Sequence, residues 1–195
     1  MNPVPTLTAG VLFFADVEEL DAVGPWEVLG YWADHVAAFP VQVVAIGHEP
    51  GVVRCSKGLG LTVDCDVEHA PPLDLLVHPG GDGTDKLQVD DEHLAWLRTL
   101  HGGGTLMASV CTGSLVFAAA GLLAGRPATT HWRYMDFFPE IDSSVEVRAD
   151  DRYVDTGSVI TSAGVSAGID MALHLVSRLD SPEAAAEVRR GIQYH

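Results

Sequence analysis

Short apolar runs rich in β-forming residues alternate along this chain with segments that have the pattern of helices. The clearest runs are residues 7–14, 41–46, 73–78 and 105–110, and each is too short to be a helix. Such alternation is typical of a mainly parallel sheet that helices cover on both faces. The pattern therefore predicts an α/β fold, and no internal repeat or linker divides the chain.

Several helices are expected between and after these strands. Pro25 suits a first helical turn and predicts a helix towards residue 33. An amphipathic helix is expected over residues 91–101, a long apolar one over 165–179, and a last one over 182–193 with Ser181 as its N-cap. The other expected elements are a hairpin at 52–65, short extended segments at 127–130, 145–148, 153–156 and 159–162, and a small helix at 132–138.

The length of 195 residues suits one domain, which we expect to span residues 1–195. No apolar run approaches the roughly 20 residues that cross a bilayer, so no membrane partner is expected. Residues 1–8 lack the basic start and apolar stretch of a signal peptide, which predicts a cytoplasmic protein.

Charge and cysteine content exclude further classes of protein. With 27 acidic and 11 basic side chains the net charge is −16, which disfavours a nucleic-acid partner. The three cysteines, Cys55, Cys65 and Cys111, form no C-x-x-C motif, and thiols of a cytoplasmic protein stay reduced. We expect Cys55 and Cys65 to be structural.

Cys111 lies where the apolar run 105–110 stops and a helical pattern of small residues begins. At such a corner, unpaired N–H groups and the positive end of the helix dipole favour a thiolate. A thiol with a lowered pKa is nucleophilic near neutral pH. The alternative is a buried cysteine that acts as a small apolar residue.

Unusual residues follow three of the expected strands: the acidic segment 16–21, the turn 79–83, and Cys111. Ligands of parallel sheets bind beyond the carboxyl ends of the strands, so we expect these three segments to converge. The turn lacks the lysine of a phosphate-binding loop, and its N–H groups are suited to face an anion.

Two other types of site are disfavoured. Residues 164–168 match G-x-S-x-G, but too little chain follows Ser166 to supply the acid and histidine of a serine hydrolase. Small residues that let a helix pack closely on the sheet explain this segment better. The nine histidines show no metal-binding spacing, so no metal is expected.

The thiol of Cys111 needs a partner for proton transfer. His131 follows a short extended segment and is one candidate. Asp21 is the other, since it precedes the helix predicted at Pro25, where an N-cap is the alternative role. A carboxyl that shares one proton with a thiolate can donate near pH 7.

Together these segments resemble the ThiJ/PfpI superfamily, the cysteine-bearing relatives of class I glutamine amidotransferases. The resemblance covers nearly the whole chain. Its motifs are Leu20-Asp21-x-x-Gly24-Pro25, Pro79-Gly80-Gly81, Ser109-Val110-Cys111-Thr112-Gly113-Ser114, Ala119-Ala120-Gly121-Leu122-Leu123-x-Gly125-Arg126, Ala128-Thr129-Thr130-His131-Trp132 and Ala167-Gly168-Ile169-Asp170.

The resemblance implies a flavodoxin-like three-layer sandwich with Cys111 as the nucleophile at a sharp turn and Asp21 as its acidic partner. It places Gly81 among the backbone donors near the nucleophile and gives Thr112 a nearby N–H and hydroxyl. His131 matches a histidine found near the cysteine in other members. The family also implies a homodimer with the site near its interface, and no metal or organic cofactor.

Two departures from the wider superfamily narrow the expected activity. Thr112 stands where many members have a histidine after the cysteine, and Asp21 stands where they have a glutamate. Both match the branch that hydrates isocyanides, although the chain ends at His195, earlier than members of that branch.

We therefore expect hydration of a compact apolar isocyanide to its formamide through a cysteine thioimidate, in a pocket with aromatic and aliphatic walls. Two alternatives remain open. One is a ligand-sensing module like those of AraC-type regulators, and the other is a glyoxalase or another cysteine hydrolase of the superfamily.

Overall fold

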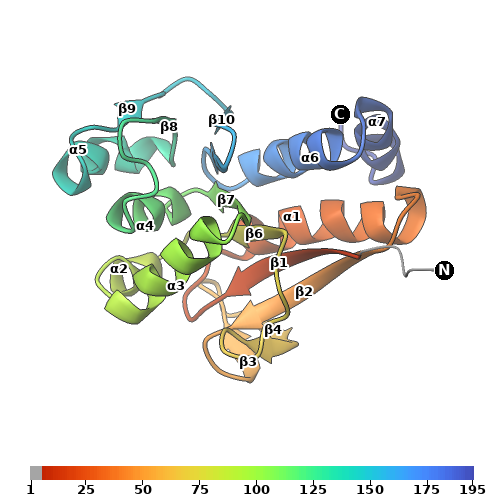
Figure 1. Cartoon of the computed structure of the whole chain (residues 1–195), viewed down its shortest axis with the longest axis horizontal. Coiled ribbons are helices and arrows are strands. Elements are labelled where there is room, and N and C mark those ends of the chain that lie inside the picture. The colour runs from red at the N-terminus through yellow and green to blue at the C-terminus, as the bar shows by residue number, and fades with distance from the viewer. Residues whose placement is uncertain (1–5) are drawn as a thin grey trace.

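The computed structural model describes residues 6–195, and its centre is a seven-stranded sheet (Figure 1). The strands are β1 (Leu7–Phe13), β2 (Val41–Gly47), β5 (Cys65–Asp66), β6 (Leu75–His78), β7 (Leu106–Val110), β10 (Tyr153–Asp155) and β11 (Val159–Ser162). They lie in the order β10-β11-β7-β6-β1-β2-β5, and every neighbouring pair except β10 and β11 is parallel. The expected mainly parallel sheet is confirmed.

Helices cover both faces of this sheet (Figure 1). On one face α1 (Glu19–Tyr31), α6 (Ala167–Leu179) and α7 (Pro182–Gly191) contact one another. On the other, α4 (Gly113–Ala119) packs against α2 (Thr84–Leu87) and α3 (Asp91–Gly102). The three-layer arrangement predicted from the alternation of strands and helices is thus present. None of the helices described between residues 6 and 195 is long and apolar enough to span a membrane.

Smaller elements lie outside the main sheet. The predicted hairpin forms from β3 (Gly51–Arg54) and β4 (Gly60–Val63). The strands β8 (Pro127–Ala128) and β9 (Glu146–Val147) make a separate parallel pair. Between them lie a 3-10 helix, Trp132–Phe137, and α5 (Phe138–Ile141). A π-helical segment, Trp32–Val36, extends α1.

The core lies where the central strands are buried on both sides. Leu12, Leu75, Leu76 and Met107 are fully buried, and each such side chain stabilises the fold by about 1.5–3 kcal/mol. Strands covered on both faces need apolar residues at consecutive positions, which explains the continuous apolar runs in the sequence.

The first helix differs from its prediction. It begins at Glu19, so Pro25 lies inside the helix and not in its first turn. Glu19 and Asp21 occupy the first turn, where acidic side chains interact favourably with the helix dipole. Pro25 is buried against the neighbouring α6, where a Cβ on Gly168 would lie 3.4 Å from its ring. Helix packing outweighs the missing N–H of the proline.

Other predicted boundaries are close to the observed ones. Ser181 caps α7 as expected, since its Oγ accepts the N–H of Ala184 at 3.1 Å. The helix after Cys111 ends at Ala119, whereas the helical pattern of small residues that predicts it runs over residues 115–123. The signal-peptide prediction concerns residues 1–8, of which 1–5 lie outside the described part of the chain.

Candidate active site

Cys111 occupies a strained turn between β7 and α4. Its φ of 57° lies in the left-handed region, which residues other than glycine seldom adopt. A Cβ on Gly113 would lie 2.4 Å from the carbonyl oxygen of His78, so the chain after Cys111 passes very close to the end of β6. The side chain is nearly buried, at 6% exposure, and lines a small cavity. The predicted turn between strand and helix is present.

Asp21 is the third residue of α1, so the alternative role as an N-cap is wrong. Its side chain is fully buried, and Oδ2 accepts the N–H of Gly80 at 3.0 Å. Oδ1 is also buried and has no hydrogen-bond partner within residues 6–195. The thiol of Cys111 lies close enough to donate a hydrogen bond to the same carboxyl, which partly offsets the rise in the pKa of Asp21 that burial causes.

Burial raises the pKa of Asp21 to about 7, and the charge of Glu18 acts in the same direction against the N–H of Gly80. Burial and then the charge of Asp21 raise the pKa of the Cys111 thiol, while the N–H of Thr112 lowers it. The pKa of this thiol is therefore raised, and not lowered as the N–H groups and the helix dipole at the corner predict. Two adjacent buried acids do not both ionise, and the pair keeps a shared proton near neutral pH.

The turn after β6 brings backbone and side chains of the site together. A Cβ on Gly80 would lie 2.7 Å from the backbone nitrogen of Thr112 and 2.9 Å from Oδ2 of Asp21, so only glycine fits between them. The N–H of Gly81 donates to Oγ1 of Thr112 at 3.0 Å. The predicted donor at Gly81 is thus directed at Thr112, whose hydroxyl also lies 3.0 Å from that of Thr84.

The three segments predicted to converge do meet. The strands that end before them, β1, β6 and β7, are neighbours in the sheet. Asp21 contacts the turn through Gly80, and the turn contacts Thr112 through Gly81. The carboxyl ends of adjacent parallel strands therefore assemble this site, as the topology predicts.

His131 lines the same cavity as Cys111. Its Nδ1 accepts the N–H of Arg133 at 3.2 Å and so caps the 3-10 helix. Burial and then the charge of Arg133 lower the pKa of His131, so the ring is neutral near pH 7. With Nδ1 as an acceptor, the ring proton is assigned to Nε2, which leaves that atom as a donor.

The cavity at Cys111 has a volume of about 180 Å³. Its walls combine charged and polar side chains with Tyr134 and Val165, so the predicted aromatic and aliphatic walls are present only in part. The lining residues are Glu18, Gly81, Asp82, Cys111, Thr112, His131, Arg133, Tyr134 and Val165. Four wall residues were not among the predicted site residues: Glu18 and Asp82, which lie in the predicted segments 16–21 and 79–83, and Arg133 and Tyr134, which closely follow His131.

The G-x-S-x-G segment also reaches the site, but not through its serine. Val165 has a φ of 54° and lines the cavity, whereas Ser166 is exposed and precedes α6. In a serine hydrolase the serine would occupy the strained turn. Its glycines allow close packing, as predicted: a Cβ on Gly168 would lie 3.1 Å from Val110, and one on Gly164 would overlap His131.

Metal ligands and the other cysteines add nothing to the site. Within residues 6–195 no three histidine, cysteine, aspartate or glutamate side chains are placed to hold a metal ion. Cys55 and Cys65 are free, and burial raises the pKa of both thiols. A larger cavity between α6 and α7 shares no lining residue with the cavity at Cys111.

Comparisons with known proteins agree with this geometry. A model described as the DJ-1/PfpI family matches residues 8–178. Isonitrile hydratase of Pseudomonas putida is 38% identical over 188 residues, which cover 96% of this chain and 78% of that protein. The HTH-type transcriptional regulator GbdR of Pseudomonas aeruginosa is 34% identical over 70% of this chain but only 36% of its own length. A crystal structure of a ThiJ/PfpI family protein from Pseudomonas syringae has a TM-score of 0.87 and 29% identity, and the match covers 100% of this chain and 78% of that one.

Proposed function

The chain belongs to the DJ-1/PfpI family, and from that premise we propose that it hydrates isonitriles to N-formamides. Its similarity to isonitrile hydratase supports an enzyme of this family. The observation that carries the proposal is the pairing of Cys111 with one buried carboxyl whose pKa is raised to about 7. An isonitrile needs both a nucleophile and a proton at the same carbon, and this pair offers both.

The first step adds the thiol across the terminal carbon of R–N≡C. In the form of the pair that holds one proton, the carboxylate of Asp21 takes the thiol proton as Sγ of Cys111 bonds to carbon. Asp21 then delivers that proton to the same carbon. The product is a thioimidate, Cys111-S–CH=N–R, and no atom leaves in this step.

The second step consumes water. Asp21, ionised again, takes a proton from a water molecule whose oxygen attacks the thioimidate carbon, and Asp21 then passes that proton to the nitrogen, which leaves its carboxylate free. The resulting S–CH(OH)–NH–R adduct expels sulfur as its hydroxyl becomes the carbonyl. That hydroxyl proton returns through Asp21 to Cys111, so the net reaction is R–N≡C plus water giving R–NH–CHO.

The remaining predicted residues receive supporting roles in this proposal. Gly81 and Thr84 fix the hydroxyl of Thr112, and the N–H of Thr112 stabilises charge on the sulfur. His131, neutral and with Nε2 as a donor, binds the polar part of the substrate. A cavity of about 180 Å³ restricts the substrate to compact isonitriles, and its polar walls favour a polar substituent.

A formamide assay with matched variants tests the proposal. We expect the protein to convert a small isonitrile to its formamide and not to convert methylglyoxal to lactate, which a glyoxalase would do. Cys111→Ala is expected to abolish turnover and Asp21→Asn to lower it by at least about 100-fold. Cys65→Ala is the control and should keep full activity, because Cys65 lies on β5 outside the cavity. Full activity of either site variant would refute the proposal.

A ligand-sensing function is the second candidate, and the similarity to the regulator GbdR favours it. The matched region spans about a third of that regulator, so a sensor of this type would be one part of a longer protein. This function would be supported if an isonitrile still binds to the Cys111→Ala variant and the unaltered chain never converts that isonitrile. Formamide production by the unaltered chain would exclude a purely sensing role.

A further inference from the structure

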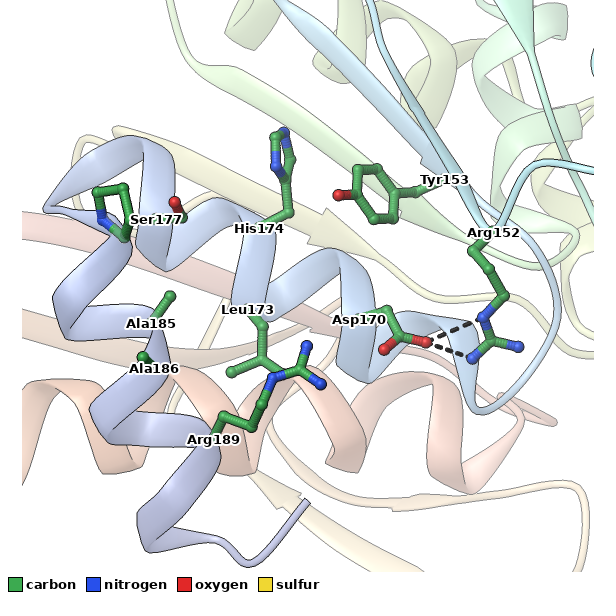
Figure 2. Close-up of a pocket in the computed structure, with 10 residues that line it drawn as sticks. Arg152, Tyr153, Asp170, Leu173, His174, Ser177, Ala185, Ala186 and Arg189 are labelled. Atoms are coloured by element: carbon green, nitrogen blue, oxygen red, sulfur yellow. Dashed lines mark hydrogen bonds and ion pairs between the residues drawn. The ribbon is translucent and has the colours of Figure 1, made fainter. Parts of the chain in front are cut away.

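A second cavity, separate from the one at Cys111, lies between α6, α7 and the start of β10 (Figure 2). Its volume is about 520 Å³. Three kinds of side chain line it: two arginines with an aspartate, three polar groups, and a set of small or apolar residues. They are Arg152, Asp170, Arg189, Tyr153, His174, Ser177, Leu173, Pro182, Ala185 and Ala186.

The charges in this cavity do not cancel. Arg152 is paired with Asp170, to which its Nε donates at 2.9 Å (Figure 2). His174 is paired with Asp155 at 2.7 Å and stacks on the ring of Tyr153. Among residues 6–195 no ion pair involves Arg189. One positive charge is therefore left over in the cavity of a chain whose net charge is −16.

Arg189 is an exposed residue that contacts an aromatic ring, and no ion pair within residues 6–195 neutralises its charge. Its guanidinium lies 5.4 Å from the centre of the Tyr194 ring, a cation–π contact that leaves the N–H groups free to donate. Figure 2 shows the side chain reaching from α7 towards Leu173 of α6. A guanidinium oriented in this way, with five donors in a planar fork, is suited to bind a carboxylate in two places.

The other wall residues indicate the shape and polarity of the rest of the ligand. Leu173 is buried at 3% exposure, and Ala185 and Ala186 leave space beside it because their side chains are short. The hydroxyls of Tyr153 and Ser177 line the same space. We propose that this cavity is a second binding site, which takes a small organic carboxylate with a flat apolar body, held by Arg189 over Leu173.

Benzoate is a suitable probe and benzamide its uncharged counterpart. Benzoate binding is measured from the NMR chemical shifts of the backbone amides in the isotope-labelled full chain, and the shifts should change at α6 and α7. We expect a dissociation constant of about 1 mM for so small a ligand. Arg189→Met keeps an unbranched apolar stem and removes the guanidinium with its charge, and should weaken binding by about tenfold or more. Arg190→Met is the matched control, since Arg190 pairs with Glu187 and does not line the cavity.

Four results would overturn this proposal. The first is that benzamide binds as tightly as benzoate, the second that Arg189→Met binds benzoate like the unaltered chain, and the third that the shifts map to the cavity at Cys111. A fourth is that sedimentation shows a dimer whose contact covers this face and excludes benzoate. Cys111→Ala should leave benzoate binding unchanged, which separates this site from the proposed isonitrile site.

Discussion

At the scale of single residues, the buried carboxyl of Asp21 determines which groups of the candidate site carry a proton. Asp21 is fully buried, and hydrogen bonds from the backbone do not replace its lost hydration, so its pKa rises to about 7. Its charge in turn opposes ionisation of Cys111. The pair therefore retains the proton that the isonitrile carbon must receive in the proposed reaction.

The pH dependence of turnover follows from this shared proton. Below about pH 7 a second proton binds to the pair, and no base remains to take the thiol proton. We expect kcat/KM to rise about tenfold per pH unit up to about pH 7 and then to level off. The measurement is kcat/KM for formamide formation between pH 5 and 9, with the uncatalysed acid hydration subtracted. A profile that is flat, or that falls above pH 7, would contradict the assignment.

The same burial makes Asp21 costly for stability. Because its pKa is raised from 3.8 to about 7 on folding, the folded state binds this proton more tightly than the unfolded state. Stability is thus lost as pH rises from about 4 to about 7, by at most about 4 kcal/mol. Asp21→Asn should raise the free energy of unfolding at pH 8 by about 2 kcal/mol or more, and by much less near pH 4.

Urea denaturation at both pH values measures this difference. Asp66→Asn serves as the control, because hydrogen bonds to His69 lower the pKa of Asp66 and its removal should not stabilise the chain at pH 8. A variant Asp21→Asn that is less stable than the unaltered chain at pH 8 would show that the carboxylate is stabilised in the fold.

Sequence position and family resemblance together predict Cys111 and Asp21 as candidate site residues. They do not identify the raised pKa of Cys111, because burial by distant segments is invisible to a local pattern. Asp82 lies in the turn 79–83, which topology predicts at the site, but no motif singles it out, and no motif relates Arg133 and Tyr134 of the 3-10 helix to Cys111. Only the packing of these segments around the cavity makes them wall residues.

At the scale of elements, two strained turns meet at the cavity. Cys111 and Val165 both have positive φ values, of 57° and 54°, and each precedes a helix. A β-branched residue is seldom found in this conformation, which costs about 1–3 kcal/mol. Surrounding contacts must compensate for that cost, and among them is the N–H of Cys111, which donates to the carbonyl of Ser162 at 3.1 Å.

At Gly80 the turn after β6 passes close to Thr112 and Asp21. Substitution of Gly80 tests whether this close contact matters for catalysis. Gly80→Ala would place a Cβ 2.7 Å from the backbone nitrogen of Thr112 and 2.9 Å from Oδ2 of Asp21. Either group must move, so we expect turnover to fall by about 100-fold, as small misplacements of catalytic groups do. Formamide formation and circular dichroism measure activity and folding.

Gly102→Ala is the matched control for this substitution. A Cβ on Gly102 meets nothing within 4 Å, and the residue ends α3. Alanine is the better helix former, so this variant should be as active as the unaltered chain and more stable by up to about 1 kcal/mol. Equal activity of Gly80→Ala and Gly102→Ala would mean that the close contact at Gly80 has no role in catalysis.

The sequence predicts helices correctly where the hydrophobic periodicity is strong, and it misplaces a helix boundary where contacts between helices determine it. The amphipathic helix expected at 91–101 is observed at Asp91–Gly102. By contrast, the proline rule places the start of α1 six residues too late, because a proline inside the first two turns is tolerated when α6 packs against it. That error concealed the position of Asp21 inside the helix.

At the scale of the whole molecule, topology explains why the site could be located from sequence. Parallel strands end at a common edge, and β7, β6 and β1 are adjacent in the sheet. Any residues that follow these strands must therefore lie near one another. The position of the second cavity does not follow from strand order, because this cavity depends on how α6 and α7 pack. The sequence alone therefore does not indicate it. The expected homodimer and cytoplasmic location stay predictions.

The large negative charge also acts on the molecule as a whole. With 27 acidic and 11 basic side chains, like charges repel one another across the surface and favour the expanded unfolded chain. Salt screens this repulsion, because the Debye length falls from about 30 Å at 0.01 M to about 3 Å at 1 M. We expect the melting temperature at pH 8 to rise by several degrees, roughly 5 °C, between these limits in sodium chloride. Near the isoelectric point of about 4.6 the net charge vanishes, and the same salt change should have little effect. Scanning calorimetry at both pH values measures this, and an equal salt effect at the two would show that screening of net charge is not its cause.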